Sequence, residues 1–205
     1  YLSYLYSTPL LNSDHKKVYE DNDCFNDIQT IYNIFNESGE SAKLIFEPIS
    51  NNFNEYSETS PDIIHIKVNS TSTKDKLDIN LDYLGELQYY KCEELKTRFN
   101  TEYELSQIKL LILSTQNIKK MKPIFNNIGI NTIIYIENKI NYPEPNKQEE
   151  EFIKELYNNM IIKGLSVLES FKKSKTKLTD TKMAELYSES KKGNDIFIVQ
   201  KNKEI

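Results

Sequence analysis

In the stretch "PDIIHIKVNSTST", an apolar run ends at a polar residue, and such a position can carry catalytic side chains. Apolar side chains occupy both parities of residues 63–68, which is typical of a parallel-sheet strand that helices cover on both faces. Reacting groups in such sheets lie beyond the carboxyl ends of the strands. We therefore expect Asn69, the first polar residue after the run, at a potential active-site edge, and His65 within the run is a candidate base.

The chain offers few groups for nucleophilic catalysis. Its candidate nucleophiles besides hydroxyls are Cys24 and Cys92, and its two histidines are His15 and His65. A histidine inside a buried strand is more often a packed, hydrogen-bonded core residue than a catalytic base. Two glutamates directly follow Cys92, and their charge would raise the thiol pKa. We interpret these side chains as structural, and because neither cysteine has a metal-ligand spacing, we expect no metal site.

The composition argues against several classes of function. The chain has five glycines and contains neither GxGxxG nor GxxxxGK[ST], so we expect no phosphate cradle and no cofactor. A net charge of -5 is unfavourable for nucleic-acid binding, which depends on clustered lysine and arginine. No apolar run approaches the roughly 20 residues of a membrane span. Two cysteines without a disulfide framework, and no signal peptide, indicate an intracellular and cytoplasmic protein.

Strand and helix patterns alternate along the chain. The predicted strands are residues 1–8, 42–48, 62–68, 108–114, 131–137 and 195–200, with a hairpin-like excursion at 77–87. The predicted helices are residues 23–37, 51–58, 89–99, 117–129, 149–164 and 165–175, the last one capped by Ser166. The buried face predicted for the first helix consists of Phe25, Ile28, Ile31, Tyr32 and Phe35.

This alternation predicts one domain, residues 1–205, that forms a three-layer α/β sandwich around a mostly parallel six-stranded sheet. The chain begins at Tyr1, directly in a predicted strand. We therefore expect the domain to be a piece of a longer, multidomain protein.

The order of these segments resembles the CHAT domain of the caspase-like peptidase clan over nearly the whole chain. Three stretches carry the resemblance: "SPDIIHIKVNS", "KLLILSTQN" and "FIKELYNNMIIKGLSVLESFKKSK". They are similar to the family's third-strand motif "DVLHFSGHG", its fourth-strand motif "LVLSACNS" and its helix pair "F...FY..L..G.SV.EAL..AR". The resemblance implies a caspase-like sheet.

The resemblance also places two amides on the family's catalytic positions. Matching "HIKVNS" to "HFSGHG" puts His65 on a structural histidine, Asn69 on the catalytic base and Ser70 on a glycine. Matching "LSTQN" to "LSACN" puts Gln116 on the nucleophilic cysteine. An amide has no pKa near neutrality and forms no thiolate, so the resemblance implies a degenerate dyad without a catalytic residue. It further implies a vestigial groove formed by His65, Ser70, Ser114 and Asn117.

Three functions are compatible with these observations. We expect a catalytically inactive, pseudo-peptidase module that binds protein, either a larger complex or other domains of the same polypeptide, such as the helical repeats that often precede CHAT domains. The second is an active CHAT-type cysteine peptidase whose nucleophile, Cys92 or Cys24, is displaced. The third is a receiver-like or TIR-like α/β binding module, which predicts five strands and no counterpart of residues 195–200.

Overall fold

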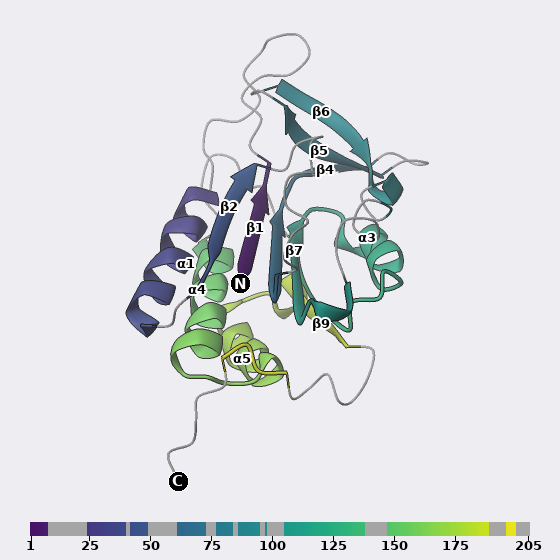
Figure 1. The fold of residues 1–205 in the computed structure, drawn as a ribbon. Coiled ribbons are helices and arrows are strands. Elements are labelled where there is room, and N and C mark those ends of the chain that lie inside the picture. Colours follow the sequence, from purple (N-terminus) through teal and green to yellow (C-terminus); the bar gives the residue numbers. More distant parts are fainter. Residues whose placement is uncertain are drawn as a thin grey trace.

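The main sheet of the computed structural model has six strands in the order β2-β1-β3-β7-β8-β9 (Figure 1). The strands are β1 (Leu2–Tyr6), β2 (Leu44–Pro48), β3 (Ile63–Lys67), β7 (Leu110–Thr115), β8 (Thr132–Glu137) and β9 (Ala184–Ser188). The first five run parallel, and β9 pairs antiparallel with β8. The prediction of a mostly parallel six-stranded sheet is confirmed, whereas the receiver-like alternative predicted five strands.

The structure describes residues 1–7, 24–39, 42–48, 61–72, 77–83, 86–94, 97, 105–137, 147–188 and 196–199. The short helix predicted at 51–58 lies outside these ranges. Among the helices within them, none has an apolar stretch long enough to cross a membrane.

The last strand of the sheet lies at residues 184–188, so the prediction of a strand at 195–200 is wrong for its described part, residues 196–199. The Ile196 carbonyl accepts a hydrogen bond from the Val167 backbone N–H at 2.8 Å, and the apolar residues of this segment pack against the helix-covered core. This apolar run therefore packs against the core without forming a strand. The strand β9 has only Ala184 fully buried, so its sequence carries a weak strand pattern.

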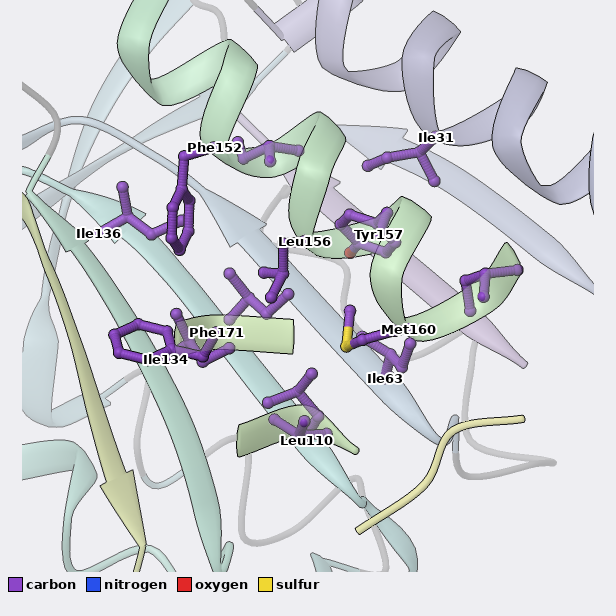
Figure 2. Packing of buried hydrophobic residues seen from close by; sticks show 14 of the residues in the cluster. Ile31, Ile63, Leu110, Ile134, Ile136, Phe152, Leu156, Tyr157, Met160 and Phe171 are labelled. Carbon is purple, nitrogen blue, oxygen red and sulfur yellow. The ribbon is translucent and has the colours of Figure 1, made fainter. Parts of the chain in front are cut away.

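Helices cover both faces of the sheet, which gives the predicted three layers (Figure 1). One face carries α1 (Cys24–Ser38), α4 (Lys147–Tyr157) and α5 (Val167–Ser174), and the other carries α3 (Ile118–Phe125). Successive residues of a strand point to opposite faces, so each strand contributes to two cores. Figure 2 shows Phe152, Leu156 and Met160 directed from the helix layer toward Ile63, Leu110 and Ile134 of the sheet.

Helix α1 buries a different face from the predicted one. Ile31 and Phe35 are buried as expected, but Phe25 and Tyr32 are 59% and 48% exposed. Asp27 takes a buried position instead, where it meets a lysine of β3. The buried face of this helix is therefore shifted from the predicted one, and Ile28 is only partly buried against the core.

The helix ends differ in detail from the predictions. Helix α3 stops at Phe125, and Gly129 adopts a φ of +91° in the connection to β8. Helix α4 passes into a π-helical turn, η3 (Asn158–Ile162), before Gly164. Helix α5 begins as predicted at Ser166, which forms a capping box with Glu169. Short 3-10 turns are η2 (Leu105–Gln107), η4 (Lys175–Lys177) and η5 (Thr181–Met183).

A small antiparallel sheet extends beyond the carboxyl ends of the main strands (Figure 1). It consists of β4 (Ser70–Ser72), β5 (Leu77–Tyr83) and β6 (Glu86–Lys91), which confirms the hairpin expected at 77–87. The predicted helix 89–99 is wrong at its start, because β6 continues to Lys91 and a helical turn begins only at Cys92.

Candidate functional site

The carboxyl ends of β3 and β7 bring Asn69 and Gln116 together. The two strands are parallel neighbours in which Lys67 pairs with Ser114, so the residues that follow emerge side by side. The Gln116 Nε2 donates to the Asn69 Oδ1 over 3.5 Å, which is at the long limit for a hydrogen bond. Both side chains are partly exposed. Each amide therefore keeps hydrogen-bonding capacity beyond this weak contact.

Ser70 and Asn117 bind the two strand ends to each other. The Ser70 hydroxyl donates to the Gln116 carbonyl at 2.7 Å. The Asn117 Nδ2 donates to the Ser70 carbonyl and hydroxyl at 3.3 and 3.1 Å. These contacts fix the backbone on either side of the Asn69 and Gln116 amides.

Glu137 at the end of β8 completes the turn that follows Gln116. Its carboxylate oxygens accept hydrogen bonds from the backbone N–H groups of Asn117 (3.2 Å) and Ile118 (3.1 Å). Asn117 itself adopts left-handed backbone angles of φ 57° and ψ 32°. The positive N-terminus of α3 is thus neutralised by a carboxylate of the same chain. The sequence analysis missed Glu137, for which the only signal was a carboxylate at a predicted strand end.

His65 lies beneath this edge, in the protein interior. It is completely buried, its Nδ1 is 3.1 Å from the Tyr157 hydroxyl, and its ring meets the Tyr4 ring edge-on at 4.6 Å. Burial and then the Lys67 charge hold the His65 pKa well below its ordinary value, so the ring is neutral. As predicted, this histidine is a packed, hydrogen-bonded core residue.

Ser114, another residue expected in the groove, is also completely buried and belongs to a network of charged side chains. Its hydroxyl donates to the Glu149 carboxylate of α4. The Lys67 ammonium lies 3.4 Å from the same carboxylate and 2.7 Å from the Asp27 carboxylate of α1. The Tyr4 hydroxyl donates to Asp27 at 3.1 Å. The sequence analysis missed this network, although a lysine inside the run "IIHIKV" was a possible signal.

Both cysteine side chains lie in the protein interior. Cys24 and Cys92 are 3% and 0% exposed. Burial, and secondarily the Glu93 charge, raises the pKa of the Cys92 thiol to about 12. Among the described residues, no group of three or more histidine, cysteine, aspartate or glutamate side chains is arranged to hold a metal ion.

The arrangement of the strands and helices is similar to that of a known peptidase. No protein-family model matches the chain, and no curated protein sequence is similar to it. The crystal structure of the Drosophila initiator caspase Dronc superposes with a TM-score of 0.50, over 84% of this chain and 70% of that chain, at 9% sequence identity. The chain has a caspase-like fold. At this identity the likeness concerns the fold alone.

Proposed function

We propose that this chain is a catalytically inactive, CHAT-like domain of caspase-like fold that serves as a structural or protein-interaction module. One observation carries the proposal: the side chains at the carboxyl ends of β3 and β7 that meet at 3.5 Å are two amides, Asn69 and Gln116. These positions match the histidine base and the cysteine nucleophile of CHAT domains. An amide neither accepts a proton near neutral pH nor attacks a carbonyl, so the pair has no peptidase chemistry.

The surroundings of the pair support this proposal. Ser70 replaces the family's glycine, and its hydroxyl is occupied by the Gln116 carbonyl. The first N–H groups of α3, which could otherwise stabilise a developing negative charge, donate to Glu137. The thiol of Cys92 is protonated at neutral pH because its pKa is about 12.

The two amides are suited to binding a protein segment. A side-chain amide donates and accepts at once, and so does every peptide group of an extended chain. The Asn69 and Gln116 side chains are partly exposed, and the contact between them within the described part of the chain is one long hydrogen bond of 3.5 Å. The partner we infer is a protein, either another domain of the same polypeptide, such as a helical repeat, or a member of a larger complex.

A peptide that carries a thiol-reactive electrophile tests whether the chain lacks cysteine-peptidase activity. We expect no labelling of Cys24 or Cys92 in the folded protein, and labelling of both in concentrated urea, as read by mass spectrometry. Labelling of one cysteine in the folded protein, together with hydrolysis of an unmodified peptide, would instead establish the displaced-nucleophile peptidase.

A rebuilt dyad tests whether Asn69 and Gln116 occupy the catalytic positions. We expect the thiol of the Q116C variant to react with iodoacetamide faster at pH 7 when Asn69→His is added, because a neighbouring imidazolium lowers a thiol pKa. The matched control is Q116C with Asn36→His, on the exposed side of α1. Equal rates in the two double variants would refute the positional match.

Cross-linking tests the interaction role separately. A photoreactive residue at position 116, introduced in the cells that make the protein, should form an adduct with another domain or protein. The same residue at exposed position 36 should not. Equal adducts from both positions would contradict a binding role for this edge.

A further inference from the structure

Four lysines follow one another closely at the end of helix α5, and we call them the basic strip. Lys172 and Lys173 lie in the last turn of α5, and Lys175 and Lys177 lie in η4. All but Lys175 are exposed, and the partly exposed Lys175 has its ammonium 5.4 Å from the centroid of the Phe171 ring. Positive charge is therefore concentrated on one surface of a chain whose net charge is -5.

The end of α5 does not need these ammonium groups as a cap. The Lys175 backbone N–H donates to the Phe171 and Lys173 carbonyls. The Thr176 hydroxyl donates to the Lys173 carbonyl at 2.7 Å. The helix dipole favours cations in the last turn, but the terminal carbonyls already have donors from the backbone and from a hydroxyl. The lysine ammonium groups thus remain directed to solvent or to a partner.

The nearby carboxylates already have other contacts. Glu169 forms the capping box with Ser166 at the start of α5. Glu155 of α4 accepts from the Lys163 Nζ at 3.3 Å. Burial opposes the effect of the cations on Glu155, but Lys163 and, more weakly, Lys177 hold its pKa below the ordinary value. Lys177 therefore lies near the Lys163–Glu155 pair, which brings η4 and the end of η3 onto the same surface.

The surface has an excess of positive charge. With Lys163 included, five lysines and the two glutamates Glu155 and Glu169 give it a net charge of plus three. No ion pair joins a lysine of the basic strip to a carboxylate within the part of the chain that the structure describes. Because the whole chain carries -5, its remainder carries minus eight. The electrostatic field of this surface attracts anions, whereas that of the remaining chain repels them.

We propose that the basic strip is a docking surface for an acidic segment of a partner protein, whose aspartate and glutamate carboxylates contact the lysine ammonium groups. Complementary charge of this kind gives a contact its orientation and its partner preference. The inference is separate from the proposed role of Asn69 and Gln116, and it stands whether or not that edge binds a partner.

The composition of the strip favours carboxylates over nucleic acid. It contains no arginine, whose planar guanidinium is the usual reader of phosphate groups. The aromatic residue of this segment, Phe171, is buried, so it offers no surface on which a base could stack. A long polyanion would also meet the negative remainder of the chain. A short acidic peptide segment needs only the strip itself.

Fluorescence anisotropy with a labelled octaglutamate peptide tests the proposal on the intact chain. We expect the Kd to rise about 10-fold or more when Lys173→Glu and Lys177→Glu are combined, since attraction becomes repulsion at two positions. The matched control combines Lys119→Glu and Lys120→Glu on the exposed side of α3, which changes the net charge by the same amount. The control should raise the Kd by less than about 3-fold, and Lys173→Arg with Lys177→Arg should retain binding.

NMR of the unmodified protein gives a test that needs no variant. On addition of octaglutamate, the backbone amide signals of residues 172–177 should shift more than those of residues 118–125. The proposal is overturned if octaglutamate does not bind at about 50 mM salt, if the shifts lie elsewhere, or if both glutamate double variants weaken binding equally. Tighter binding of octauridylate or of phosphatidylserine vesicles than of octaglutamate would also overturn it, in favour of nucleic acid or membrane. Each outcome concerns the end of α5 and leaves the proposed inactivity at Asn69 and Gln116 untouched.

Discussion

The Glu137 carboxylate accepts the backbone N–H of Asn117 at 3.2 Å, across the turn that carries Gln116. A second hydrogen bond, to the Ile118 N–H at 3.1 Å, makes Glu137 the cap of helix α3. One residue at the end of β8 therefore neutralises the helix terminus and supports the left-handed backbone of Asn117.

Replacing Glu137 should consequently weaken this turn. We expect Glu137→Gln to lower the free energy of unfolding by about 1 kcal/mol, because the variant loses the charge at the helix N-terminus and one of two acceptors. Urea denaturation measures the loss. Glu151→Gln, at an exposed position of α4, should change stability by less than about 0.5 kcal/mol, and equal losses would argue against the capping role.

Removing the buried lysine should cost far more. We expect Lys67→Met to lower the free energy of unfolding by about 3–5 kcal/mol at pH 7.5, because two buried carboxylates lose the ammonium that lies 2.7 and 3.4 Å from them. Lys109→Met is the matched control, since Lys109 also pairs with an aspartate at 2.7 Å but its side chain is 45% exposed. The control should lose about 1 kcal/mol or less. A Lys67→Met protein as stable as the control would refute this electrostatic role.

The Tyr157 hydroxyl should also be necessary for stability. Tyr157→Phe leaves the His65 Nδ1 buried without this partner, and we expect a loss of about 1–3 kcal/mol in the free energy of unfolding. Thermal unfolding at pH 8, where His65 is neutral in both states, measures it without interference from protonation. Tyr32→Phe, which removes a hydroxyl from a half-exposed side chain, should have almost no effect. If both variants lose the same amount, the hydrogen bond is energetically unimportant.

Alkylation kinetics should reveal the environment of Cys92. With a pKa of about 12, only about one Cys92 thiol in 10,000 is ionised at pH 8. In a Cys24→Ser background, we expect iodoacetamide to modify Cys92 roughly a thousand-fold more slowly in the folded chain than in urea. Mass spectrometry follows the modification. Comparable rates in the two conditions would show that the thiol is accessible and activated.

The core strands could be predicted because their side chains are buried on both faces. The runs that became β3, β7 and β8 contain several consecutive apolar residues, and all but one of their residues are buried. Their short length and β-branched residues favour strands over buried helices. The strand β9 could not be recognised, because it forms a sheet edge and alternates too weakly. Residues 196–199 form an apolar run that packs against the core without joining the sheet, and a short apolar run alone does not distinguish the two surroundings.

The candidate site likewise contains one contact that the sequence could predict and one network that it could not. The meeting of Asn69 and Gln116 could be predicted, because parallel neighbouring strands end at the same edge of a sheet. The network of Asp27, Lys67 and Glu149 could not be predicted, because it joins three elements that are distant in sequence. Charged residues on amphipathic helices are also usually exposed, so nothing local marks these two acids as buried.

The strand order of the main sheet has a consequence for synthesis on the ribosome. After β1 and β2 have paired, each later strand of this sheet (β3, β7, β8 and β9) joins a neighbour that has already been made. The sheet can therefore extend in one direction as the nascent chain emerges, and no gap must be held open for a strand still to come. The caspase-like core is thus compatible with vectorial, strand-by-strand assembly, and β9 closes the far edge after α4 and α5 have been translated.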